Sequence, residues 1–287
     1  MIAQGDNDID WSLEIKPQES LFNFPWREIW IYRDLLGMFV KRDVVTVYKQ
    51  TILGPVWFFI QPILTTLVYL VIFGNIAQLS TDGLPKILFY LSGVIIWNYF
   101  ADCFNQTANT FRANAHIFGK VYFPRLIIPI SKIASALIKF GIQLLLLVVV
   151  YAYFSIFRDF PIQVNPYMLL LPFLVLLMAG YGIAFGLIFT SLTTKYRDLT
   201  FLISFGVQLL MYATPVIYPL SSVPEEYRQA LLINPISSIV EGFRFAILGT
   251  GSFNWSNIVY SSIVLLGSLF VGLIIFNRTE KNFIDTV

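Results

Sequence analysis

Six long stretches of the chain are dominated by apolar residues and contain almost no charge. They cover residues 54–76, 87–104, 126–157, 167–193, 199–220 and 257–276. A helix needs about 20 apolar residues to cross the hydrocarbon core of a bilayer. In lipid, the backbone groups of a segment must be hydrogen-bonded within the protein, which favours helices. We therefore predict an all-α polytopic membrane protein with six transmembrane helices. Charged residues are 13% of the sequence, which is low against about 25% in soluble domains.

The segment before the first apolar stretch divides into two parts. The leader covers residues 1–24. Its start, Met1 to Glu14, is polar and acidic and lacks the basic start and short apolar core of a cleaved signal peptide. We expect a cytoplasmic leader here. Residues 25–53 have a different pattern, because apolar side chains recur at helical spacing: Trp26, Ile29, Trp30, Leu36, Phe39, Val40, Val44 and Val47.

A basic amphipathic helix that contains tryptophan is typical of the membrane interface. We therefore predict that residues 25–53 form an N-terminal amphipathic interface helix and that residues 54–287 form the transmembrane domain. The alternative is a small soluble helix ahead of the first span.

The basic residues predict the orientation. Thirteen of the 19 Lys and Arg residues fall on the side that holds both termini, four fall on the other side, and Lys132 and Lys139 lie within the third apolar stretch. Because loops rich in Lys and Arg stay in the cytoplasm, we expect a multi-pass protein of the cytoplasmic (inner) membrane with both termini inside.

The segment 224–248, between the fifth and sixth stretches, fits neither a span nor an ordinary loop. Asn234-Pro235 divides it, and asparagine at an N-cap followed by proline at the first helical position is a strong helix-start signal. Each half is too short to cross the membrane. We predict an outer re-entrant helical hairpin; the alternative is an outer-surface loop. Glu241 and Arg244 are one helical turn apart and are expected to pair.

The sequence does not favour catalysis. It contains no GxxxxGK[ST] phosphate loop and no GxSxG nucleophile elbow. His116 is the only histidine and Cys103 the only cysteine, so neither a histidine metal site nor an internal disulfide is expected. We expect no metal, no cofactor and no enzymatic activity in this chain, and no nucleic-acid partner.

Few ionisable residues lie within the spans. Asp102 is the one clear acidic residue there, and it lies near the inner end of the second span. Lys132 and Lys139 are seven residues apart and share a helix face. They either line a cationic pore or extend to the cytoplasmic interface. Ion-coupled carriers usually show more buried ionisable groups than this.

Aromatic side chains within the spans are candidates for a polymer pathway, since a ring stacks on sugar C–H surfaces while its polar tip needs a partner. We select Trp97, Tyr212 and Tyr218 first, and Tyr69 and Phe100 after them. Tyr212 and Tyr218 flank Thr214-Pro215, where the fifth stretch loses a backbone donor. The alternative for each residue is packing or an interfacial belt.

Short motifs in a fixed order resemble those of permease subunits of ABC-type polysaccharide exporters. They run from about Arg27 to Phe276 and comprise Lys41-Arg42-Asp43, residues 48–57 with Gln61-Pro62, Leu91-Ser92-Gly93 with Trp97, residues 120–125 with Pro129, Tyr196-Arg197-Asp198, and Asn234-Pro235 with Glu241, Phe243 and Arg244.

This resemblance implies six transmembrane helices that work as a homodimer with two copies of a separate ATPase subunit, which would hold ATP and Mg. It also implies that the cargo is a lipid-linked polysaccharide such as an O antigen, capsule or teichoic acid. On this basis we expect Lys120, Phe123, Pro124 and Arg125 to dock the ATPase, with Phe123-Pro124 as an apolar knob. Asn234, Pro235, Glu241 and Arg244 would form an outer gate, because a polymer pore has to seal when idle.

Three alternatives come from other classes. A permease of the same architecture for drugs or lipids would have an apolar central surface. An ion-coupled carrier would continue transport after loss of the ATPase. A membrane-bound glycan enzyme would need carboxylates or histidines near one membrane face, and the sequence offers few.

Overall fold

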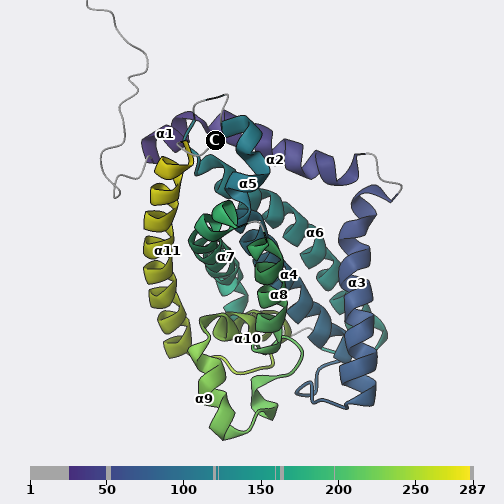
Figure 1. Ribbon diagram of the computed structural model, residues 1–287. Helices are drawn as coiled ribbons and strands as arrows, with labels where there is room; N and C mark the ends of the chain where they lie inside the picture. Colours follow the sequence, from purple (N-terminus) through teal and green to yellow (C-terminus); the bar gives the residue numbers. More distant parts are fainter. Residues whose placement is uncertain are drawn as a thin grey trace, which may run out of the picture.

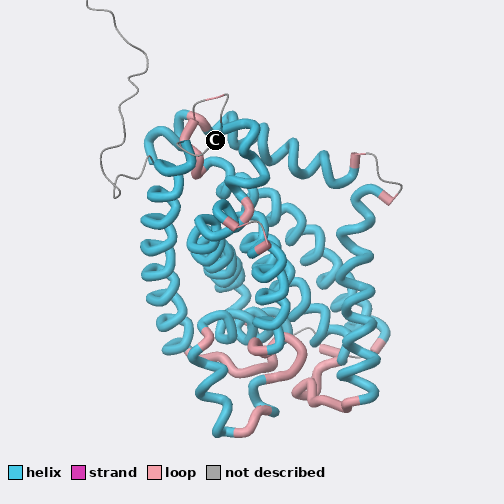
Figure 2. Tube along the Cα trace, in the orientation of Figure 1, coloured by secondary structure: helices cyan, strands magenta, loops and turns pink. Residues whose placement is uncertain are grey.

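The computed structural model describes residues 26–49, 53–118, 121, 123–158, 160–161, 165–196 and 198–284. The leader (residues 1–24) and Lys120 lie outside this part of the chain. Within it every regular element is a helix and there is no strand; loops and turns connect the helices (Figure 2).

The helices form a bundle of long, roughly parallel elements closed at each end by shorter ones (Figure 1). The long helices are α3 (Trp57–Tyr69, continued by a π-helical segment, Leu70–Ile76), α4 (Lys86–Ala108), α6 (Ile127–Phe157), α7 (Leu171–Lys195, preceded by a 3-10 turn, Pro166–Leu170) and α11 (Trp255–Ile284). Five segments are long and apolar enough to cross a membrane, or six if the bent pair α9–α10 counts as one. The predicted membrane-protein class is therefore confirmed at that level.

At one end of the bundle lie α1 (Trp26–Ile31), α2 (Arg33–Tyr48) and α5 (Thr110–Phe118); we call this the interface-helix end. α2 runs across the ends of the long helices rather than along them (Figure 1, top). Phe39 of α2 is buried against the bundle, while Trp30 of α1 and Met38 of α2 are exposed. Residues 26–48 are thus helical as predicted, with one interruption at Tyr32.

At the opposite end, the hairpin end, the chain forms α9 (Glu225–Ile233) and α10 (Pro235–Leu248), which meet at 101°. The predicted helix start is confirmed: the Asn234 side chain caps α10 by accepting a hydrogen bond from the Ile236 N–H at 3.1 Å, and Pro235 is the first helical residue. The helix ends at Gly249, which adopts the left-handed conformation (φ 73°) common after helices.

The fifth predicted span is shorter than its apolar stretch. α8 (Leu199–Tyr212) has 14 residues, a length of about 21 Å against a hydrocarbon core of about 30 Å. The helix ends before Thr214-Pro215, where proline cannot donate a helical hydrogen bond. The chain then turns and leads through a short 3-10 segment, Leu220–Ser222, into α9.

The core is built around α4 and α7, which pack closely along their lengths. Gly182 and Gly186 of α7, four residues apart, face Cys103 and Thr107 of α4. A Cβ at either glycine would overlap the facing side chain, and also crowd the α4 backbone. This is the small-residue contact that lets two membrane helices approach closely.

Candidate functional site

The accessible face of α4 is polar, although α4 is one of the candidate spans. Between residues 88 and 109, every position except Ala101 that is not buried carries a polar side chain: Asn98, Asp102, Asn105, Gln106 and Asn109. Their spacing of three or four residues places them on one side of the helix. We call these five residues the polar face.

The contrast with α11 is informative. Between residues 257 and 276, the exposed positions of α11 are Val259, Tyr260, Ile263, Leu266, Gly267, Phe270 and Val271, and its partly buried positions include only three polar residues, Asn257, Ser262 and Ser268. That surface suits lipid. Three of the five, Asp102, Asn105 and Asn109, have polar partners on neighbouring helices. A cluster of this kind is suited to water or to a polar molecule rather than to lipid.

α8 lies beside the polar face and is hydrogen-bonded to it. Thr200 Oγ1 donates to Asn109 Oδ1 at 3.2 Å and accepts from Arg112 Nη1 at 2.9 Å. Ser204 Oγ lies 3.5 Å from Asn105 Oδ1. These side chains join α4 and α8 by polar contacts in the half of the bundle that is nearer the interface-helix end (Figure 1).

The other side of the polar face is held by α6. Lys139 Nζ lies 2.8 Å from Asp102 Oδ2, and Lys132 Nζ lies 2.8 Å from Asp43 Oδ2 on α2. Neither lysine is therefore a free cation lining a pore, and neither simply extends to water. Both are paired with carboxylates from other helices. The sequence pattern offered a cationic pore lining or extension to the interface, and it did not predict this pairing.

Toward the hairpin end the accessible groups are aromatic. Tyr212 is 46% exposed at the last turn of α8, and the Tyr218 hydroxyl donates to its carbonyl at 2.9 Å. Tyr69 of α3 is half-buried, and its hydroxyl reaches Met211 Sδ at 3.4 Å. These three predicted pathway residues therefore lie near one another, where α3 meets α8.

Trp97 and Phe100, the other two predicted pathway residues, lie elsewhere. They are 4% and 0% exposed, and their rings pack on each other with centroids 5.1 Å apart. They belong to the core of the subunit, so in this conformation their faces are covered by protein. The surface that α4 does expose carries the polar face instead. Its spacing was visible in the sequence, but only Asp102 was singled out.

The predicted outer-gate residues form one connected unit. Glu241 and Arg244 pair at 2.8 Å, and each side chain is only 2% exposed. Arg244 Nη2 also donates to the carbonyl oxygens of Pro215 and Val216, at 3.2 and 3.1 Å. Its guanidinium carbon lies 3.9 Å from the centroid of the Phe89 ring of α4.

Gly93 makes room for this arginine. A Cβ at Gly93 would lie 2.6 Å from the Val216 carbonyl oxygen and 3.1 Å from Arg244 Nη2. Asn234 adds a second link, since its Nδ2 donates to Ala213 O at 3.2 Å and to Thr214 Oγ1 at 2.9 Å. The hairpin is thus bonded directly to the chain that follows α8 and packed on α4.

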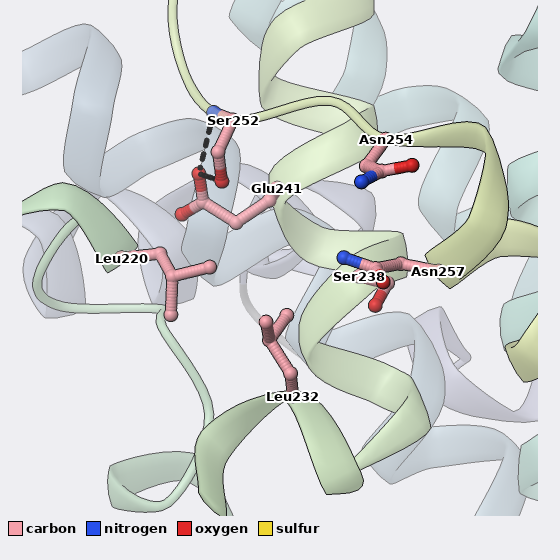
Figure 3. Close-up of a pocket in the computed structure, with 7 residues that line it drawn as sticks. All are labelled: Leu220, Leu232, Ser238, Glu241, Ser252, Asn254 and Asn257. Carbon is pink, nitrogen blue, oxygen red and sulfur yellow. Dashed lines mark hydrogen bonds between the residues drawn. The ribbon is translucent and has the colours of Figure 1, made fainter. Parts of the chain in front are cut away.

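A small polar pocket lies beside this unit (Figure 3). It is lined by Leu220, Leu232, Ser238, Glu241, Ser252, Asn254 and Asn257. Glu241 Oε2 accepts from the Ser252 N–H at 3.3 Å, so the carboxylate is held from both sides.

The predicted docking residues are placed differently from expectation. Phe123 is 4% exposed and packs against Phe39 of α2 and Phe118 of α5, each with centroids 5.8 Å apart. Pro124 is buried as well. The expectation of an exposed Phe123-Pro124 knob is corrected, because α2 and α5 cover these apolar groups.

Arg125 also points inward. Its Nη1 donates to the Glu280 carbonyl oxygen at 2.9 Å, and its Nε lies 3.7 Å from Glu280 Oε1. Burial lowers the pKa of the Arg125 guanidinium from its ordinary value, and the Glu280 carboxylate acts in the opposite direction. Arg125 thus links this segment to the end of α11. The accessible groups nearby are Arg112, Ala113 and His116 of α5, and Val121, which is 58% exposed.

Comparison with known proteins shows the family of this chain. Residues 34–248 match the model of the ABC-2 type transporter family. The chain belongs to that family. Among its relatives is the O-antigen export system permease protein RfbA of Klebsiella pneumoniae, 26% identical over 253 residues that cover 88% of this chain and 94% of the relative.

Two further relatives extend the comparison within the ABC-2 family. The O-antigen export system permease protein RfbA of Myxococcus xanthus is 29% identical over 76% of this chain and 82% of its own length. The polysialic acid transport protein KpsM of Escherichia coli is 26% identical over 84% of this chain and 91% of its own. The similarity to permeases of polysaccharide exporters therefore extends over most of the chain, and the family resemblance predicted from the sequence motifs is confirmed.

Proposed function

We propose that this chain is the transmembrane subunit of an ABC transporter that exports a lipid-linked polysaccharide of the O-antigen or capsule kind. Two copies would form the pore, and two copies of a separate ATPase subunit would bind ATP and Mg and drive transport. The observation that carries the proposal is the polar face of α4, since a polar polymer needs a hydrated surface inside the membrane. The relatives supply the class of cargo.

The proposed pathway runs along α4 and α8 from the interface-helix end to the hairpin end. Asn, Gln and Ser side chains of the first half exchange hydrogen bonds with sugar hydroxyls. The tyrosines of the second half, Tyr69, Tyr212 and Tyr218, offer ring faces that desolvate sugar C–H groups without binding one sugar tightly. A chain can then slide from one contact to the next.

The proposed orientation follows the positive-inside rule. Both termini are cytoplasmic, α2 lies in the inner interface, and α9 and α10 form a re-entrant hairpin that closes the outer mouth of the pore. Asn234 and Pro235 set the bend of this hairpin, while Glu241 and Arg244 brace it. α5 and Val121 present the exposed cytoplasmic groups nearest to the segment first expected to contact the ATPase, and we assign docking to them.

The first test is the accessibility of the polar face to water. In a Cys103→Ser background, single cysteines at Asn98, Asn105 and Asn109 should react with a membrane-impermeant maleimide in permeabilised membranes. Cysteines at Ile263 and Leu266 of α11 serve as matched controls on the apolar surface and should react at least about tenfold more slowly, since the reactive thiolate is disfavoured in lipid. Equal, slow labelling at both sets would show that the polar face is not wet.

The second test addresses Tyr212. Tyr212→Phe keeps the ring and should retain export, whereas Tyr212→Leu keeps apolar bulk but loses the stacking face and should slow export of long polymer. Stacking of a nucleic-acid base on an aromatic side chain is worth about 1–3 kcal/mol. By analogy, loss of one sugar–ring contact should lower the rate of export about fivefold or more. The measurement is surface polysaccharide in a strain that lacks the wild-type chain. Full export by Tyr212→Leu would assign Tyr212 to packing.

A further inference from the structure

A groove lies at the hairpin end of the bundle, between the last turns of α6 and the start of α4. Its empty volume, with the open side included, is about 950 Å³. Two of its lining residues are polar, Tyr153 and Arg158, and none is a carboxylate. The apolar lining consists of Pro85, Ile87, Val150, Phe154 and Phe160. The groove is therefore apolar along its walls and carries a single positive charge.

The walls of this groove are held by contacts within the chain. After α6 the chain turns back, so that the Phe160 N–H donates to the Phe154 carbonyl oxygen at 3.3 Å. The Phe160 ring also packs on the Tyr151 ring, with centroids 6.0 Å apart. Pro85 and Ile87, at the start of α4, form the facing wall. The space is thus bounded by two helices and by a turn that is bonded to one of them.

The two polar groups of the groove are not used within the protein. Arg158 is exposed, and its guanidinium has no ion-pair or hydrogen-bond partner among the described residues. Tyr153 is 49% exposed, and its hydroxyl has no hydrogen-bond partner in the same part of the chain. The cation at the start of α4 is directed elsewhere, since Lys86 Nζ donates to the Gly74 carbonyl oxygen at 2.5 Å. Arg158 and Tyr153 are therefore open to a ligand.

The length of α6 sets the depth of the groove in a bilayer. The helix has 31 residues, which is about 46 Å, against a hydrocarbon core of about 30 Å and about 40–45 Å with both headgroup regions. Arg158 directly follows the last helical residue, so it lies at the level of lipid phosphates. Val150 and Phe154 come one and two turns earlier and lie beside acyl chains. Tyr153 fits the aromatic belt between these levels.

We propose that this groove binds one anionic phospholipid whose headgroup carries a phosphate and no ammonium, of the phosphatidylglycerol type. Arg158 pairs with the phosphate, and the Tyr153 hydroxyl donates to one of its oxygens. One acyl chain lies along Ile87, Val150 and Phe154. The charge-assisted contact at the rim provides the selectivity, and the bound lipid joins the start of α4 to the end of α6.

Other ligands match this lining less well. A zwitterionic phospholipid offers the same phosphate, but it brings its own ammonium close to Arg158, and like charges repel. No lining residue is a carboxylate that could receive that ammonium. A soluble phosphate ester would contact only the polar rim and would leave the apolar walls uncovered. Asp159 lies outside the described residues, so its carboxylate is tested separately below.

The test is independent of the cargo. The purified full chain in mild detergent is mixed with limiting, equal amounts of phosphatidylglycerol, phosphatidylethanolamine and phosphatidylcholine, and native mass spectrometry measures the first lipid retained per chain. Phosphatidylglycerol should be retained at least about fivefold over each of the others, the effect expected of one partly exposed ion pair. Free glycerol 3-phosphate should not displace it. Equal retention of the three lipids, or displacement by glycerol 3-phosphate, would overturn the inference.

Two matched pairs of variants locate the site. Arg158→Gln should remove the preference, whereas Arg228→Gln should keep it, because that guanidinium at the same end of the bundle donates to backbone carbonyls. Val150→Trp should lower the retention of lipid by filling the groove. Val149→Trp makes the same change at an exposed neighbour that does not line the groove, and it should leave retention unchanged.

Asp159→Asn removes the acidic neighbour of Arg158 and should keep the preference. Thermal unfolding of each variant shows whether the chain is folded. A preference that survives Arg158→Gln, one that is lost in Asp159→Asn, or equal effects of tryptophan at positions 149 and 150 would contradict the assignment of this groove. None of these results bears on polysaccharide export, which is measured separately.

Discussion

Replacing Arg244 with alanine should lower the free energy of unfolding by about 3–5 kcal/mol, because it leaves a buried carboxylate without its partner. Glu241 is 2% exposed, and the guanidinium that neutralises it also holds the Pro215 and Val216 carbonyls. The measurement is the unfolding transition of the purified subunit in detergent. Arg228→Ala, on the neighbouring α9, is the control. Its guanidinium donates to the Ser221 and Val223 carbonyls near the surface, and its loss should cost about 1 kcal/mol or less.

A double variant separates the ion pair from bulk packing. Glu241→Gln with Arg244→Met removes both charges and keeps similar volumes, so it should be more stable than Arg244→Ala alone. If the costs of Glu241→Gln alone and Arg244→Met alone simply add up to the cost of the double variant, the pair contributes no coupling energy and the account of this unit is wrong. Because the same pair braces the proposed gate, Arg244→Ala should also raise ion leak or basal ATPase activity. Loss of stability with a sealed pore would make the hairpin structural only.

Replacing Gly186 with valine should cost about 3 kcal/mol, the upper part of the range for overpacked cores. The new side chain would overlap Thr107 and press on the Phe104 carbonyl of α4, so α7 and α4 would have to separate. Gly141→Val on α6 is a matched control, since a Cβ there meets no atom within 4 Å. Detergent unfolding measures both. Similar transitions for the two variants would show that close approach of α4 and α7 is not what the glycine provides.

How far the sequence predicted this structure depends on the kind of signal. Two local signals were confirmed. Asn234-Pro235 starts α10, and Glu241 pairs with Arg244 one helical turn away. Apolar stretches were identified well by their length. Their ends were less certain, because hydrophobicity continues past Tyr212 while the helix stops before Thr214-Pro215.

Facing directions within the spans could not be predicted, and the physical reason is the solvent. In a bilayer, lipid tails are as apolar as the protein interior, so an aromatic residue is equally compatible with either. Trp97 and Phe100 could therefore not be told from exposed aromatics, and they are buried in α4. The same holds for Phe123, whose covering by α2 depends on contacts between distant segments. Polar residues carry more information, and Asn98, Asn105 and Asn109 recur at a helical spacing that marks one face.

The central claim is that a polysaccharide passes along the surface shared by α4 and α8. The direct measurement replaces Ser204 with the photoreactive amino acid p-benzoylphenylalanine, in cells that make the polymer and the ATPase partner. Its ketone captures nearby C–H groups, and Ser204 lies on the exposed side of α8 next to Asn105. Irradiation should attach long polysaccharide to the chain, seen as a glycan-positive band of high mass that disappears when the ATPase is inactivated. The same amino acid at Leu266, on the apolar surface of α11, should give none. A glycan adduct at Leu266 equal to that at Ser204, or no adduct at Ser204 in cells that export polymer, would contradict the account.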